Sequence, residues 1–269
     1  MENGQSLLRI FLLTFKRADD EDTIWVAVKS ENADMLTTDS YNMFLLYPLY
    51  IAMYYKSDMH IHGKVSERLY NNVISYLQPI MCSFSDDLKR IKVIADDFGE
   101  MDGGTHHLVG TGISGGVDCL ATIYTHFQVE QCKENKINAL FMTNFATDKD
   151  VKKRDLFNAR CLDMKRIADA LGLPFYAVDC NFDSFLKLGD RCSYFALYSC
   201  AFALEKVLGK YYISSSLSYG EILKWHANSH NRDWSEFADP YAIPLIESKK
   251  LKLISDGCQH TRSEKTELI

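Results

Sequence analysis

The chain has 269 residues, of which 47% are hydrophobic and 25% are charged, and its formal net charge is −6 at pH 7. This length allows either one large domain or a small domain followed by a larger one. The acidic balance argues against general nucleic-acid binding, and no apolar run reaches the roughly twenty residues that a membrane span needs. The short apolar stretch near the N-terminus has acidic flanks, unlike a signal peptide. We therefore expect a cytoplasmic protein without a membrane partner.

The eight cysteines are scattered along the chain without a C-x-x-C pair. This spacing disfavours a zinc ribbon or a lattice of disulfides. Reduced thiols, partly buried among apolar neighbours, are the simpler expectation.

Residues 1–100 are predicted to form a small N-terminal α+β domain. Two β-branched, apolar segments are separated by the acidic turn "RADDEDT", which is typical of a hairpin or of neighbouring strands. Ser66 is the expected N-cap of a later helix. The expected elements are strands at 7–15 and 23–29, a helical segment at 41–55, a strand at 58–63, a helix after Ser66 and a strand at 90–98.

Residues 101–224 alternate strictly between strand-like and helix-like patterns. Such an order predicts an α/β fold with a parallel, doubly wound, Rossmann-like sheet and helices on both faces. Ligands in this architecture bind at the carboxyl ends of the strands, where the strand order reverses. The expected strands are 107–113, 138–145, 174–180 and 210–217, and the expected helices lie near 118–130, 150–171, 193–208 and 219–226.

Periodicity weakens after residue 224, so 225–269 is predicted to be an irregular C-terminal segment with short elements. Its last residues, "TELI", fall within a helix-like pattern, which leaves open a continuation beyond Ile269.

The motif "TGISGGVDC" stands between the first of the alternating strands and its helix. Gly115 and Gly116 allow a tight turn whose consecutive amides point into one concavity. Ser114 adds a hydroxyl, and the beginning of the following helix adds partial positive charge. The motif therefore predicts a cradle for phosphate oxygens. The simpler alternative is a glycine-rich turn in which Asp118 is an ordinary first-turn acid.

Two better-known phosphate loops do not match the motif. The Walker loop needs a lysine before its final Ser or Thr, and the dinucleotide fingerprint needs a different glycine register. Asp118 would repel phosphate by itself, but it suits a Mg²⁺ ion that bridges phosphate oxygens. Asp118 is therefore the candidate metal ligand.

This motif resembles the Ser-Gly-Gly-x-Asp-Ser signature of the N-type ATP pyrophosphatases, the PP-loop superfamily, whose fold is HUP-like. Ser114, Gly115, Gly116 and Asp118 match, whereas Cys119 stands where the family usually has a second serine. A thiol is a weaker hydrogen-bond donor than a hydroxyl. The resemblance covers roughly residues 105–220, and the layout is similar to 7-cyano-7-deazaguanine synthase-like, asparagine synthetase-like and uncharacterised PP-loop proteins. A tail pattern of the uncharacterised members is matched by Asp239-Pro240, Asp256-Gly257, Arg262, Glu264 and Lys265.

The resemblance implies an adenylating enzyme that uses ATP and Mg²⁺ and releases AMP and pyrophosphate. A carbonyl or carboxylate oxygen of a small-molecule or peptide substrate would attack the α-phosphorus, and a nitrogen or sulfur donor would displace the adenylate. The expected catalytic residues are Ser114, Asp118, Arg262 and Lys265. The expected nucleotide-binding residues are Gly112, Ile113, Ser114, Gly115, Gly116, Asp118, Cys119, Thr143 and Asn144, and the expected metal ligand is Asp118.

Several of these assignments have simpler alternatives. Thr143 and Asn144 end a strand, where they either meet adenine or ribose or form a plain turn. The hydroxyls of 214–216 either hold substrate or form a polar turn, and Arg262 and Lys265 either clamp anions or lie on the surface. A sulfonucleotide reductase-like enzyme using Cys258 and a nucleotide-binding protein without turnover remain alternative functions, and a homodimer is left open.

Overall fold

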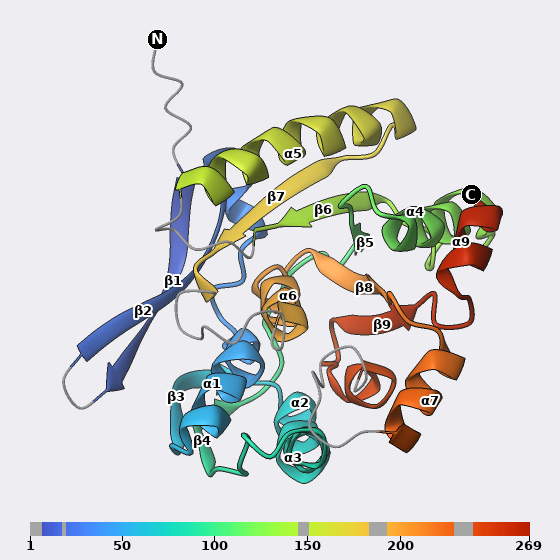
Figure 1. Cartoon of the computed structure of the whole chain (residues 1–269). Coiled ribbons are helices and arrows are strands. Elements are labelled where there is room, and N and C mark those ends of the chain that lie inside the picture. Colours follow the sequence, from blue (N-terminus) through green and yellow to red (C-terminus); the bar gives the residue numbers. More distant parts are fainter. Residues whose placement is uncertain (1–6, 18–19, 145–150, 183–192, 229–238) are drawn as a thin grey trace.

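A seven-stranded sheet in the order β1-β2-β7-β6-β5-β8-β9 runs through the molecule (Figure 1). The computed structural model describes residues 7–17, 20–144, 151–182, 193–228 and 239–269. Five neighbouring strands, β7, β6, β5, β8 and β9, are parallel, while β2 runs antiparallel to β7 and β1 antiparallel to β2. The strands are β1 Leu7–Arg17, β2 Asp20–Lys29, β5 Leu108–Gly112, β6 Ala139–Thr143, β7 Phe175–Cys180, β8 Leu208–Ser214 and β9 Lys252–Asp256.

The strand order reverses at β5. From β5 the chain adds β6 and β7 on one side, and it then returns to add β8 and β9 on the other side. The main chain therefore leaves β5 in one direction and β8 in the other, which opens a crevice outside their carboxyl ends. This arrangement confirms the expected α/β fold with a mostly parallel sheet, and it is compatible with a Rossmann-like fold.

Helices cover both faces of the sheet. In one core cluster, the helix residues Ile123 and Ala168 pack with Leu140 of β6 and Tyr212 of β8. The other cluster contains residues of helix α6 together with Phe141 and Tyr211, which are adjacent to Leu140 and Tyr212 in the same strands. Successive side chains of a strand point to opposite faces, so the two clusters lie on opposite sides of the sheet. The helices are α4 Val117–Ile123, which continues as a π-helical turn over Tyr124–Val129, α5 Val151–Leu171, α6 Ser193–Ala203, α7 Tyr219–Asn228 and α9 Arg262–Leu268.

The segment before residue 100 contributes to two sheets. The hairpin β1–β2 joins the central sheet, where Val26 of β2 pairs with Cys180 of β7. The remaining strands, β3 and β4, form a separate parallel pair. After the hairpin, this segment forms two 3-10 helices at Ser30–Met35 and Asn42–Leu45, α1 Tyr47–Tyr55, β3 Met59–Val65, α2 Glu67–Asn72, a π-helical turn at Val73–Leu77, α3 Gln78–Phe84 and β4 Val93–Phe98.

The predicted N-cap is present, because the Ser66 hydroxyl accepts a hydrogen bond from the Leu69 amide at 3.4 Å. The central sheet and its larger core cluster both extend across the boundary predicted at residue 100. The apolar residues of the first hundred therefore pack in the same core as those of β6, β7 and β8.

The C-terminal segment contributes a strand and a helix to the main body. β9 pairs with β8 in parallel, and α9 packs beside α4 (Figure 1). Residues 225–269 were predicted to be irregular with short elements, and the structure has a short strand at Lys252–Asp256 and a short helix at Arg262–Leu268 in this segment. A capping box fixes the beginning of α9, since Thr261 and Glu264 each bond the backbone amide of the other. Within the described ranges, no helix is both long and apolar enough to cross a bilayer.

Candidate functional site

The bend between β5 and α4 is open to solvent. Ser114, Gly115 and Gly116 are all exposed. Gly115 has φ +79°, a conformation that side chains with a Cβ rarely adopt, and Gly116 is extended at φ −79° and ψ 158°. In the part of the chain that the structure describes, neither glycine amide donates to another protein group. Two consecutive donors are thus available at the strand-order reversal.

The buried thiol of Cys119 forms hydrogen bonds with the backbone of this bend. Its thiol donates to the Gly116 carbonyl at 3.0 Å and accepts from the Ser114 amide at 3.4 Å, while the Ser114 hydroxyl lies 3.7 Å from the sulfur. The side chain is buried, with 6% of Cys119 exposed. Cys119 therefore fixes the shape of the bend, and its sulfur does not line the open side.

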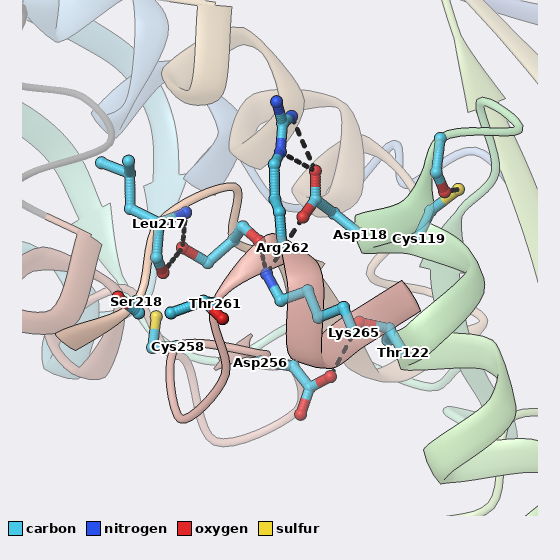
Figure 2. Close-up of polar contacts among 12 residues, drawn as sticks. Asp118, Cys119, Thr122, Leu217, Ser218, Asp256, Cys258, Thr261, Arg262 and Lys265 are labelled. Atoms are coloured by element: carbon cyan, nitrogen blue, oxygen red, sulfur yellow. Dashed lines mark hydrogen bonds and ion pairs between the residues drawn. The ribbon is translucent and has the colours of Figure 1, made fainter. Parts of the chain in front are cut away.

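Asp118, in the first turn of α4, is paired with two cations from α9 (Figure 2). Lys265 Nζ donates to Asp118 Oδ1 at 3.0 Å, and Arg262 Nη2 and Nε donate to Oδ2 at 2.9 and 3.3 Å. The structure thus brings together Asp118, Arg262 and Lys265, three of the predicted catalytic residues, although 144 and 147 positions separate the cations from the acid.

The two cations differ in their surroundings. The Lys265 side chain is 1% exposed, and its ammonium also donates to the Ser215 carbonyl at 2.5 Å. The Arg262 side chain is 65% exposed. Lys265 is consequently a fixed positive charge, whereas Arg262 has room to turn toward an anion in the crevice.

Gly257 allows Lys265 to reach this position. It has φ +84°, and a Cβ there would lie 3.2 Å from Cε of Lys265. The strand end after β9 therefore requires glycine both for its backbone conformation and for the passage of the lysine stem. Ser215, the residue after β8, takes part through its carbonyl oxygen, and its hydroxyl donates to the Leu217 carbonyl.

A network behind Asp118 ties α4 to the end of β9. Asp256 accepts hydrogen bonds from Thr122 Oγ1 at 2.7 Å and from His126 Nε2 at 2.9 Å. His126 also stacks on Tyr212, with ring centroids 3.9 Å apart. Burial raises the pKa of Asp256, but the bonds from His126 and Thr122 outweigh it, so the pKa lies below its ordinary value. The ionised Asp256 thereby holds α4 and the loop before α9 together.

Sequence reasoning missed Thr122 and His126. Their spacing on α4, four residues apart on one helical face, was the available signal. The signal could not be used without knowing that the end of β9 lies opposite that face.

The remaining predicted nucleotide-binding residues lie at the neighbouring strand ends. Ile113 is buried in the core, and its amide donates to the Phe141 carbonyl at 2.8 Å. Asn144 is also buried, and its side-chain amide donates to Asp179 Oδ1 at 2.8 Å. Gly112 and Thr143 are half-buried. The Ile113 amide is therefore engaged within the sheet, and the bond to Asp179 ties Asn144 to β7.

The tail pattern divides into two groups. Arg262 and Lys265 reach Asp118, whereas Asp239 is buried and accepts a hydrogen bond from the Tyr198 hydroxyl. Glu264 belongs to the capping box of α9. Among these residues Arg262 and Lys265 bond to Asp118, while Asp256 bonds to α4 and Gly257 packs against the Lys265 side chain.

Binding of Mg²⁺ by the Asp118 carboxylate would compete with the two cations. A carboxylate offers about four lone-pair positions, and the hydrogen bonds from Arg262 and Lys265 occupy three of them. If Arg262 turned to a phosphate, Oδ2 would become available as a hard oxygen ligand of the kind that Mg²⁺ prefers. The donor set fits the ion on this condition.

Comparisons with known proteins add no further constraint: no protein-family profile matches the chain, and no curated protein or solved structure shows significant similarity to it. The functional argument therefore depends on the geometry of the site and on the resemblance of its motif.

Proposed function

We propose that this protein is an ATP-dependent adenylating enzyme of the PP-loop type. The observation that carries the proposal is the exposed Ser-Gly-Gly bend at the strand-order reversal, with Asp118 at its helix and two cations from α9 beside it. Free amides and fixed positive charge are what a polyphosphate requires.

In the proposed reaction, the β- and γ-phosphates of ATP lie against the amides of Gly115 and Gly116 and near the Ser114 hydroxyl. Arg262 turns from Asp118 to a phosphate oxygen, and Lys265 keeps Asp118 in place. Mg²⁺ held by Asp118 would neutralise charge on the phosphate oxygens. Because Arg262 would leave Asp118 when phosphate binds, the Asp118 oxygen that coordinates Mg²⁺ would become available at the same moment.

The chemical step is an in-line displacement at the α-phosphorus. A substrate carbonyl or carboxylate oxygen forms the new P–O bond, the α–β bond breaks, and pyrophosphate takes the electron pair. A nitrogen or sulfur donor then attacks the activated carbon, and AMP leaves. The chain supplies alignment and charge stabilisation, with no side-chain nucleophile.

Nucleotide selectivity tests the proposal without knowledge of the acceptor. With Mg²⁺ present, we expect ATP and pyrophosphate to compete for one site and AMP to bind much more weakly, as measured by calorimetry. Arg262→Gln should weaken ATP binding by about tenfold, since a hydrogen bond to a charged group contributes about 1.5 kcal/mol or more. The matched control is Arg166→Gln, which removes an exposed arginine, 80% accessible, that pairs only with Asp163 on the surface of α5.

The proposal would be refuted by equal binding of AMP and ATP, or by loss of ATP affinity in both arginine variants. With candidate acceptors, turnover is measured as AMP and pyrophosphate formed from labelled ATP.

A nucleotide-binding protein without turnover is the second candidate, and Cys119 favours it because a thiol bonds the bend more weakly than a hydroxyl. Cys119→Ser distinguishes the two: pyrophosphate release that appears only in the variant supports the second candidate, and equal release by both proteins supports the enzyme. The reductase alternative is not proposed, because the Cys258 thiol is buried beside the Ser255 hydroxyl at 3.3 Å and a nucleophilic thiol needs access.

A further inference from the structure

The small parallel sheet β3–β4 carries a second group of chemically distinctive residues. His60 and His62 alternate along β3 and share one of its faces, and Asp96 lies on the neighbouring strand β4. All three residues are exposed. Figure 1 shows β3 and β4 on the side of the molecule away from α4 and α9, so this group is separate from the bend after β5.

The three side chains converge on one point. His60 Nε2 lies 2.6 Å from Asp96 Oδ1, and His62 Nδ1 lies 3.2 Å from Asp96 Oδ2. The two imidazole rings are in contact, with centroids 4.0 Å apart. One ligand atom from each residue falls within 4.8 Å of the other two. Two nitrogen donors and one carboxylate thus surround a single small volume.

The pairing of β3 with β4 positions the three side chains near one another. His60 pairs with Ile94 and Ile61 with Ala95, and after a register irregularity Lys64 pairs with Asp97, so Asp96 lies opposite the short stretch that contains His62. Ile61 between the histidines is buried at 1% exposure, which fixes the face that both imidazoles share. A site built on paired strands keeps its ligands closer to their bound positions than a loop would.

From this geometry we propose that His60, His62 and Asp96 form a binding site for a divalent transition-metal ion, with Zn²⁺ as the best match. Tetrahedral zinc has Zn–N and Zn–O bonds of about 2.0–2.2 Å, which place neighbouring ligand atoms roughly 3.3–3.6 Å apart. The two nitrogen–oxygen contacts, 2.6 and 3.2 Å, are shorter than this spacing, and rotations of the exposed side chains would open them to it.

The choice of metal follows from the ligands. Imidazole nitrogen suits zinc and its transition-metal neighbours, whereas Mg²⁺ and Ca²⁺ prefer sets of oxygen ligands. Asp96 adds one carboxylate oxygen to the two imidazole nitrogens, a mixed ligand set that zinc accepts. Three protein ligands leave a fourth position to water, and the ion would join β3 to β4.

Zinc binding to the intact, untagged protein tests the site. In competition with a chromophoric chelator, we expect one equivalent of Zn²⁺ to bind, and His60→Ala, His62→Ala and Asp96→Asn each to lower the affinity about tenfold or more. The matched control is His107→Ala, which removes an exposed histidine outside the group. Cys132→Ser, at an exposed thiol, controls for binding by sulfur.

Co²⁺ gives a second readout, because it produces visible absorption bands that report the ligand geometry. We expect these bands in the parent protein and in Asp118→Asn, and their loss in the His60→Ala/His62→Ala double variant. Circular dichroism establishes that the double variant is folded. The proposal is overturned if the parent protein binds no Zn²⁺ against the chelator, or if the double variant binds it as tightly as the parent.

Discussion

Lys265→Met tests whether the buried cation is what holds α9 against the bend. The parent side chain is 1% exposed, and its ammonium donates to Asp118 at 3.0 Å and to the Ser215 carbonyl. Hydrogen bonds that involve a charged group contribute about 1.5–3 kcal/mol each, so the two together amount to about 3–6 kcal/mol. Methionine would preserve the packing of the side-chain stem, and Asp118 would still be paired with Arg262. We therefore expect the free energy of unfolding to fall by about 3 kcal/mol, which is the low end of the cost of breaking a buried ion pair.

Urea denaturation at neutral pH measures this loss as a change in the free energy of unfolding. The comparison is Arg262→Met, which removes a cation whose side chain is 65% exposed, and we expect it to cost about 1 kcal/mol or less. A double-mutant cycle that combines Lys265→Met with Asp118→Asn should give a coupling energy of about 1 kcal/mol or more.

The reasoning is refuted if the two cation variants lose equal stability. It is also refuted if the Lys265 and Asp118 substitutions are additive within about 0.5 kcal/mol, because residues that do not interact behave in that way.

Four further substitutions probe the backbone, a buried acid and a helix cap. Gly115→Ala should cost about 1–2 kcal/mol in urea denaturation, because Gly115 has positive φ, while Gly116→Ala, at negative φ, should cost markedly less; equal costs would contradict the conformational argument. Burial raises the pKa of Glu205 above 4.5, so the folded protein keeps a proton that the unfolded chain loses, and native stability falls as the pH rises from 4.5 to the folded pKa. The stability of Glu205→Gln relative to the parent should therefore increase as the pH rises above about 4.5, and a pH-independent difference would contradict the raised pKa. Ser66→Ala removes a buried cap that also bonds Glu100 at 2.9 Å, and it should lower the midpoint of urea unfolding by the equivalent of about 1–2 kcal/mol; an unchanged midpoint would show that water replaces the cap.

Local signals were sufficient for the alternating part of the fold. The expected helix near 150–171 is α5, Val151–Leu171, and Gly172 follows it with φ +69°, as a C-terminal glycine should. The strands expected at 107–113 and 174–180 are β5 and β7. These elements carry their own periodicity and end signals, so a single sequence defines them.

Strand β9 could not be recognised in this way, because it is short and its pairing partner is distant in sequence. Lys252–Asp256 has a mixed burial pattern, and it becomes a strand through its bonds to β8. The same holds for the β1–β2 hairpin: its own pairing was predictable, but its attachment to β7 depends on a contact between Val26 and Cys180.

The candidate site was only partly predicted, because some of its residues are adjacent in sequence and others meet only in the folded chain. The Ser-Gly-Gly bend and Asp118 are adjacent in sequence and could be interpreted together. Arg262 and Lys265 are expected from a resemblance alone, and no local pattern indicates that they meet Asp118. Their meeting depends on β9 and on the positive φ of Gly257, which are properties of the folded chain.

Asp118 and Lys265 are separated by 147 residues along the chain, so the site is complete only when both ends of this long segment have come together. A contact that closes so long a loop forms late in folding, after the local elements on either side are in place. A polypeptide interrupted by proteolysis or premature termination ahead of Arg262 would retain the bend but lack both positive charges. If the site binds nucleotide as proposed, only molecules that have completed the whole fold would bind it with both cations in place.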